Sequence, residues 1–593
     1  MPRPYCLIIA ALWLWSVIPV GASAQHGGLD YETSWYAEGA PYVKIDVVED
    51  GIYRVSGSDI AAALPAGTAL SDIDPATLQL FERGTEVPID LDADGSLQPG
   101  DAMIFVGLRN RGDDETWAYN DDASLQSSAH RSLYTDTTTY WLTWAQTDEG
   151  LRYASSRATA TTPTTALRDT AWAERDTRYY FGRPNQSNTP LYSESEGYYW
   201  HRFTHNNTAP RTFSYTLPVD RRDATASAPL DLRIRFDAET NSCHRVEVEA
   251  QLTSGGGTAY ESLGTTSWQG TARRTFEASV DASRIPDDGL PLRITSYNDG
   301  FDSGCPSPAS TPNYVLLDWI AAEYDRTLQA RADDWQRIVL PNAQTYTLDL
   351  SGHTGTPVAY SPDTALMATA EGDALLSVDN PTAGAAYWAV GSSGYKAPVT
   401  MQAHTGTNWA NPDAHAADYL LIAPPALEES AQSMADYRRM QGGYDVAMVP
   451  LQAIFDAFDY GRPSPIAIRR FVHQSQQWST PPRFLAIWGD AQHPIYTNGV
   501  DDRTPPWSVP SFGYSPSDGW YGMQQNGPTD WSELLAIGRI PVRNNAQGEL
   551  FLDKLSTYES APLDLWQQRM TMLAGGTTPS EQQSLQFYSN RWA

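Results

Sequence analysis

Apolar and polar residues alternate with a period of two over much of the first 400 residues, which is the pattern of half-buried β-strands. Two hairpin-like units come first: residues 42–47 and 52–55 around Glu49-Asp50-Gly51, and residues 78–81 and 87–89 around Arg83-Gly84. Apolar runs at 103–106 and 140–144 predict buried strands. Together these elements predict an N-terminal β-domain over residues 25–157.

A second β-rich unit follows a Thr- and Ala-rich stretch at 158–166, which is typical of a linker. Alternation is strict at 230–236 and 246–250, and a further apolar strand is expected at 314–320. Strict alternation with Ser, Gly and Thr turns predicts a β-sandwich with one solvated face per sheet, over residues 167–327. A smaller β-rich domain is expected over residues 328–412.

The pattern changes at residue 413, where short continuous apolar runs alternate with helical spacing. Strands are predicted at 419–422, 446–449, 484–488, 534–537 and 570–573, and helices at 427–440, 465–478 and 547–558. Gly442-Gly443 is the stop signal of the first of these helices. Strand–helix–strand alternation with near-continuous apolar strands predicts an α/β domain over residues 413–593, with a parallel sheet covered by helices.

Composition narrows the classes of function. The 593 residues include 71 Asp and Glu but only 40 Lys and Arg, so the formal net charge is −31. A surface this acidic repels phosphate backbones, and we therefore expect no nucleic-acid partner. Hydrophobic residues make up 41% of the chain, which is enough for the cores of several domains.

The first 24 residues have the three parts of a secretory signal peptide. Arg3 precedes an apolar run at 7–20, and Ala22-Ser23-Ala24 is a small-residue cleavage site. We expect cleavage after Ala24 and export of the remaining chain. No later stretch has 18 consecutive apolar residues, so no helix is expected to cross a membrane.

The chain has three cysteines, and the first of them, Cys6, lies in the predicted signal peptide. In an exported protein the other two are expected to form a Cys243–Cys305 disulfide. The alternative is a reactive thiol at either position, but neither has the basic or helical surroundings that activate a thiol.

Several segments after residue 413 resemble, in order and spacing, the opening of a gingipain-type cysteine peptidase domain. They include 441–446 (QGGYDV), 454–461 (IFDAFDYG), 484–490 (FLAIWGD), 517–522 (SDGWYG) and 536–543 (AIGRIPVR). The segments at 42–55, 74–81, 99–105 and 140–144 are similar to the β-rich N-terminal part of the PorU-like members of this family. Those members act as signal peptidases or sortases of the type IX secretion system.

The resemblance implies a caspase-like fold, Cys–His thiol catalysis and protein or peptide substrates. It also implies a secreted or outer-membrane location, with outer-membrane secretion components as partners, and no organic cofactor. The family's two catalytic residues belong to strands later than 570–573, and the chain ends first, so we expect an α/β domain that is incomplete at its C-terminus. Residues 413–593 contain no cysteine and only three histidines, His415, His473 and His493. We therefore assign no catalytic residue. His473 is expected to be a packed or surface residue of a helix.

Acidic residues give two candidate calcium sites, each with a plainer alternative. The first is a loop with the spacing of a calcium-binding loop, formed by Asp90, Asp92, Asp94 and Asp101. Gly95 supplies the sharp turn of such a loop, although the flanking elements are strands and an acidic surface turn would have the same sequence. The second candidate is Asp490, at a strand end, where a carboxylate can bind calcium or cap the next turn. Asp518 faces the same choice, whereas Arg539 and Arg543 are expected to pair with acidic neighbours.

Two hypotheses of function follow. The first is an exported cysteine-type peptidase that processes proteins, with type IX secretion cargo as candidate substrates. The second is a non-catalytic surface protein whose β-domains bind protein or glycan and whose peptidase domain is inert or truncated.

Overall fold

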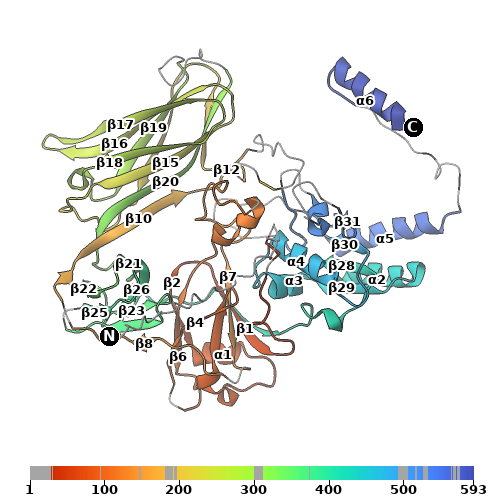
Figure 1. Cartoon of the computed structure of the whole chain (residues 1–593), viewed down its shortest axis with the longest axis horizontal. Coiled ribbons are helices and arrows are strands. Elements are labelled where there is room, and N and C mark those ends of the chain that lie inside the picture. Colours follow the sequence, from red (N-terminus) through yellow and green to blue (C-terminus); the bar gives the residue numbers. More distant parts are fainter. Residues whose placement is uncertain are drawn as a thin grey trace, which may run out of the picture.

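The computed structural model describes residues 28–592, except 30, 94, 120, 146–147, 160, 181–190, 193–195, 300–310, 373, 492–504, 514–516, 525–531, 563, 565–568 and 570–574. The predicted signal peptide and the predicted strand at 570–573 lie outside this part. Four units follow one another along the chain: a β-domain, a β-sandwich, a small β-domain and an α/β domain (Figure 1). This confirms the predicted multidomain architecture. Within the described residues, no helix is long and apolar enough to cross a membrane.

The N-terminal β-domain has two sheets, ordered β27-β1-β7-β3-β4 and β2-β6-β5. Their strands are β1 (Pro41–Val47), β2 (Gly51–Ser56), β3 (Gln79–Glu82), β4 (Thr85–Val87), β5 (Asp90–Asp92), β6 (Ala102–Gly107), β7 (Thr138–Thr143) and β27 (Thr400–Thr405), with the short helix α1 (Gly57–Ala62) after β2. The predicted hairpin β3–β4 is confirmed. The predicted hairpin of β1 and β2 is wrong: β7 and β27 occupy both edges of β1, so β2 pairs with β6 in the second sheet.

The sandwich is confirmed as two antiparallel sheets around one apolar core. One sheet contains β10 (Ala166–Glu174), β13 (His201–His205), β15 (Leu230–Ala238), β18 (Arg274–Val280) and β20 (Asn313–Thr327); the other contains β14 (Arg211–Leu217), β16 (Cys243–Ser254), β17 (Gly257–Gln269) and β19 (Leu290–Tyr297). Two short strands, β11 (Arg178–Tyr179) and β12 (Tyr198–Tyr199), pair beside them. Buried and part-exposed residues alternate along most of β15, as the sequence pattern predicts.

The small β-domain corrects two predicted boundaries. Its sheets are β21-β26-β23-β24-β8 and β25-β22-β9, with β21 (Trp335–Leu340), β22 (Thr345–Asp349), β23 (Val358–Ser361), β24 (Leu366–Thr369), β25 (Leu375–Asp379), β26 (Ala385–Val390), β8 (Ala154–Ser155) and β9 (Pro163–Thr164). The segment predicted as a linker at 158–166 therefore contributes β9, which pairs with β22, and β8 just before it pairs with β24. At the other end β27 leaves the predicted 328–412 domain and pairs with β1. In each case the pairing supplies hydrogen bonds to otherwise open strand edges.

The α/β domain has a parallel sheet in the order β29-β28-β30-β31. Its elements are β28 (Tyr419–Ala423), α2 (Glu428–Gly442), β29 (Val446–Pro450), α3 (Leu451–Phe458), α4 (Pro465–Ser475), β30 (Phe484–Trp488), β31 (Ala536–Ile540), α5 (Asn545–Ser560) and α6 (Pro579–Trp592). Gly443 ends α2 in the left-handed conformation (φ 62°), as the Gly-Gly signal predicts. Strand β31 begins two residues later than predicted, because the Leu534 N–H bonds to the carbonyl of Gly522 in the preceding loop.

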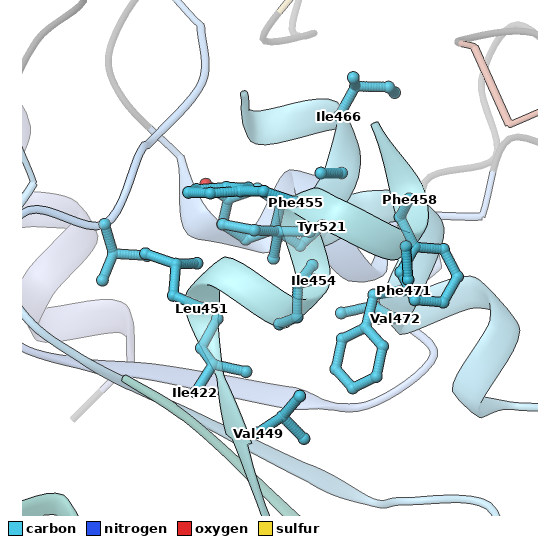
Figure 2. Close-up of a cluster of buried hydrophobic side chains, with 14 of the residues drawn as sticks. Ile422, Val449, Leu451, Ile454, Phe455, Phe458, Ile466, Phe471, Val472 and Tyr521 are labelled. Carbon is cyan, nitrogen blue, oxygen red and sulfur yellow. The ribbon is translucent and has the colours of Figure 1, made fainter. Parts of the chain in front are cut away.

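Helices cover both faces of this sheet. Helices α2 and α5 pack on one face, and α3 and α4 pack on the other. Figure 2 shows side chains of α3 and α4, among them Ile454, Phe458 and Phe471, gathered over Ile422 and Val449 of the sheet. The same apolar cluster continues into the N-terminal β-domain through buried aromatic residues such as Trp141. The two domains thus share one core.

Buried ion pairs cross the same interface. Lys44 of β1 lies 2.6 Å from Asp456 of α3, and Asp456 is 3% exposed. Arg462, which follows α3, lies 2.7 Å from Asp114 of the N-terminal domain and 2.9 Å from Asp459. Because each ion has a partner on the facing element, separating the domains would leave buried charges unpaired.

Buried carboxyl groups gather where the sandwich meets a loop of the N-terminal domain. Glu174 accepts a hydrogen bond from Ser128 Oγ (2.8 Å), and Asp318 accepts one from Ser127 Oγ. Burial raises the pKa of Glu174 to about 8, and the charge of Asp176 adds to this effect. Burial also raises the pKa of Asp318 well above its usual range. These groups are therefore proton-holding contacts between the two domains.

Candidate functional site

The carboxyl edge of the parallel sheet is the candidate functional site. All four strands run in one direction, so their carboxyl ends and the loops after them lie at a single edge. In open α/β sheets, ligands bind at this edge. The loop after β30 begins with Gly489-Asp490, and a described segment at 505–513 returns beside it, where Val509 N–H donates to the Asp490 carbonyl (3.0 Å).

Arg539 of β31 holds this edge together. Its guanidinium donates two hydrogen bonds of 2.7 Å to the two carboxylate oxygens of Asp518. Its remaining three N–H groups donate to the carbonyls of Gly489, Val509 and Pro510, each at 3.1 Å. Burial alone would lower the pKa of Arg539, but the hydrogen bonds with Asp518 reverse this and raise it. Since all five donors of the guanidinium are used, Arg539 is suited to shaping the edge, not to binding a substrate.

Asp490 pairs with Arg543 at the same edge. Arg543 Nε donates to Asp490 Oδ2 (2.8 Å), and the other carboxylate oxygen accepts the N–H of Ala491 (2.8 Å). Arg543 also lies over the ring of Trp507, with its guanidinium carbon 4.8 Å from the ring centroid. The pairing predicted for both arginines is confirmed. These contacts favour the turn-capping role of Asp490 over calcium binding, because the carboxylate already has a cation and a backbone N–H as partners.

The calcium loop at 90–101 is described only in part. Strand β5 contains Asp90 and Asp92, and Asp90 accepts a hydrogen bond from the Tyr360 hydroxyl (2.9 Å). Asp101 accepts a backbone N–H three residues before it (2.7 Å). Asp94 lies outside the described residues. In the part of the chain that the structure describes, no three His, Cys, Asp or Glu side chains are grouped to hold a metal, so calcium in this loop stays a prediction.

The histidines of the α/β domain are packed side chains where the structure describes them. His415 stacks on Trp409 at a centroid distance of 4.5 Å and contacts the Asn408 carbonyl through Nε2 (3.0 Å). His473 lies within α4, as predicted, and burial lowers its pKa to about 4. His493 lies outside the described residues. Neither described histidine has a cysteine to activate, because residues 413–593 contain none.

Cys243, at the start of β16, is disulfide-bonded. Its predicted partner, Cys305, lies outside the described residues. The Cys243–Cys305 pairing therefore stays a prediction, and it is the pairing that the cysteine count of an exported chain leaves available.

One arginine of this site was missed by sequence reasoning. Arg469 of α4 is fully buried and donates to the carbonyls of Trp520 and Met523, the latter at 3.1 Å. Burial lowers its pKa to about 10. It thereby fastens the short helical segment η8 (Asp518–Gly522), which carries Asp518, onto α4. A charged residue on the otherwise apolar face of the predicted helix at 465–478 was the available signal.

Comparison with known proteins supports a peptidase-like edge. Residues 413–591 match the model of peptidase family C25. The crystal structure of dimeric latent PorU from Porphyromonas gingivalis matches with a TM-score of 0.59 and 17% identity, over 92% of this chain and 52% of that chain. This chain therefore spans about half the length of that protein, and the likeness shows the fold.

Other matches carry no argument. A structure of infectious bursal disease virus, Gx strain, gives a TM-score of 0.15 and 9% identity over 69% of this chain and 68% of that chain. The isomalto-dextranase of Arthrobacter globiformis gives 0.15 and 9%, over 48% of this chain and 35% of that chain. A comparison with curated protein sequences gives no match.

Proposed function

We propose, on the premise that residues 413–591 belong to peptidase family C25, that the chain recognises protein or peptide segments at the carboxyl edge of its parallel sheet. The observation that carries this proposal is the order of the edge itself. Arg539 ties the ends of β30 and β31, the segment at 509–510 and Asp518 into one unit. A preformed edge of this kind binds an extended chain at lower entropic cost than mobile loops do.

The proposed chemistry is that of a gingipain-like cysteine peptidase. In such an enzyme a histidine activates a cysteine, and the thiolate attacks the peptide carbonyl. After removal of residues 1–24, the cysteines of this chain are Cys243 and Cys305, both outside the α/β domain. The polypeptide ending at Ala593 therefore supplies recognition and scaffold, and a nucleophilic cysteine is not among its residues 413–593.

The finer proposal is an exported protein that processes other exported proteins at the cell surface. The signal-peptide pattern of residues 1–24 supports export, and the fold shared with PorU supports a role in the secretion system in which PorU-like proteins act. Outer-membrane secretion components are the partners proposed on the same grounds.

The second candidate function is a non-catalytic surface protein with protein- or glycan-binding β-domains. The absence of cysteine from residues 413–593 favours it. It differs from the first candidate in where a peptide binds: on the β-domains and not at the carboxyl edge of the α/β sheet.

One experiment tests the proposed chemistry. The polypeptide of residues 25–593 is incubated with fluorescent casein and a pool of casein peptides, with and without iodoacetamide, and both hydrolysis and peptide binding are measured. We expect binding without thiol-dependent hydrolysis. Hydrolysis that Cys243→Ala or Cys305→Ala abolishes would refute the assignment of the dyad outside these 593 residues, and failure to bind any casein peptide would refute peptide recognition.

A further inference from the structure

A pocket of about 250 Å³ lies between the N-terminal β-domain and the sandwich, away from the α/β domain. Arg109 and Arg131 line it from the N-terminal domain, and Glu174 and Arg175 line it from the end of β10 and just beyond. A volume of 250 Å³ corresponds to about eight water molecules at roughly 30 Å³ each, which is room for a small organic molecule.

The charge of this pocket is opposite to that of the chain. Acidic residues outnumber basic ones by 71 to 40 overall, yet the pocket lining has three arginines and one carboxyl group, that of Glu174. Burial raises the pKa of Glu174 to about 8, so this carboxyl group is mostly protonated at pH 7 and does not repel an anion. The lining is therefore cationic at neutral pH.

Two of the arginines are held in position from behind. Arg109 donates to the His130 carbonyl (2.8 Å) and to Asp136 (3.4 Å). Arg131 lies 3.6 Å from Asp136 and 3.3 Å from Asp176. Neither Asp136 nor Asp176 lines the pocket. Fixed guanidinium groups pay less side-chain entropy when they bind a ligand.

The third arginine differs from the other two. Arg175 is exposed and forms no ion pair with the part of the chain that the structure describes; its guanidinium carbon lies 5.6 Å from the ring centroid of Trp200. Trp200 and Tyr215 complete this side of the pocket. A guanidinium on an aromatic ring, without a carboxylate partner, is available to a ligand.

We propose that this pocket binds a small ligand that carries several oxyanion groups, with Arg109, Arg131 and Arg175 as its cationic contacts. Carboxylate and phosphate oxygens match the paired N–H groups of guanidinium, and this shared chemistry defines the ligand class. The ligand would contact both domains, so its binding would stabilise their junction. The proposal concerns a site outside the α/β domain and is independent of the proposed peptidase function.

The test is a titration of the polypeptide of residues 25–593 with sodium citrate and, separately, with inorganic phosphate. Sodium chloride holds the ionic strength constant, and both calorimetry and tryptophan fluorescence are recorded, since Trp172 and Trp200 line the pocket. The test variant is Arg175→Gln. Its matched control is Arg178→Gln, which removes the same charge from another exposed arginine three residues along that is not part of the lining.

We expect saturable binding of at least one probe, weakened about tenfold or more by Arg175→Gln, which is the loss of one charge-assisted hydrogen bond, and unchanged by Arg178→Gln. Citrate as the tighter probe identifies a polycarboxylate site, and phosphate as the tighter probe identifies a site for phosphorylated molecules. Two results would overturn the proposal: no saturation by either probe, or equal weakening by the two arginine variants.

Discussion

Replacing Arg539 by Met removes the guanidinium that ties together the carboxyl edge of the sheet while keeping an unbranched apolar side chain. The change deletes five hydrogen bonds. It leaves the carboxylate of Asp518, which is 22% exposed, without its cation. It also leaves three backbone carbonyls, of Gly489, Val509 and Pro510, without this donor.

The magnitude follows from burial. The Arg539 side chain is 11% exposed, and breaking a buried ion pair by removing one partner costs about 3–5 kcal/mol. We therefore expect the free energy of local opening around β30 and β31 to fall by about 4 kcal/mol. At 1.4 kcal/mol for each factor of ten, amide hydrogen exchange in these strands should accelerate by nearly a thousandfold. Arg539→Lys keeps the charge but loses the forked geometry, so it should fall between Arg539→Met and the unchanged chain.

Arg543→Met is the matched control. Arg543 pairs with Asp490 two residues beyond the end of the same strand, but its side chain is 59% exposed. An exposed pair contributes at most about 1 kcal/mol, so exchange should accelerate by roughly fivefold or less. The assay is hydrogen exchange followed by mass spectrometry on peptides that cover residues 484–488 and 536–540. Equal, small accelerations in the two variants would refute the role given to Arg539.

Three further predictions concern the β-domains. Because burial raises the pKa of Glu174 to about 8 from 4.5, its folded form holds a proton that the unfolded chain releases; stability should fall by at least ~2 kcal/mol as pH rises from 5 to 8, and Glu174→Gln should flatten this part of a denaturation profile. Mass mapping of exported, non-reduced protein should show a Cys243–Cys305 link, which would contribute roughly 4 kcal/mol by chain entropy; two free thiols would contradict it. Millimolar calcium, but not sodium at equal ionic strength, should raise the melting temperature through the 90–101 loop by mass action, and Asp92→Ala with Asp94→Ala should abolish that rise; a rise that persists in the double variant would rule this loop out.

Much of the fold could be predicted from local pattern. The alternation of β15 and the continuous apolar runs of β28 and β30 each predict the burial that the structure has. Helix α3 was missed, although Leu451, Ile454, Phe455 and Phe458 have the i, i+3, i+4, i+7 spacing of an amphipathic helix. A helix of eight residues between a strand and a glycine gives a short signal, and its burial is set by the neighbouring β-domain.

Pairings between distant segments could not be predicted. Strand β27 pairs with β1 across some 350 residues, and β8 and β9 join sheets whose other strands come some 200 residues later. The choice among open strand edges depends on the assembled domains, which no local period records. The pairing of Arg539 with an acidic neighbour was predictable from charge at a strand end, but its three carbonyl contacts depend on how the loop at 505–513 returns.

The most direct test of peptide recognition at the carboxyl edge is a map of where peptides bind. The polypeptide of residues 25–593 is incubated with a random octapeptide library that carries a benzophenone photo-cross-linker, and the cross-linked residues are identified by mass spectrometry. We predict cross-links at Gly489-Asp490 and within 505–513 and 517–524, competed by unlabelled peptides and reduced by Arg539→Met. Cross-links confined to the sandwich or the small β-domain would contradict the proposal and favour a non-catalytic, β-domain binding protein.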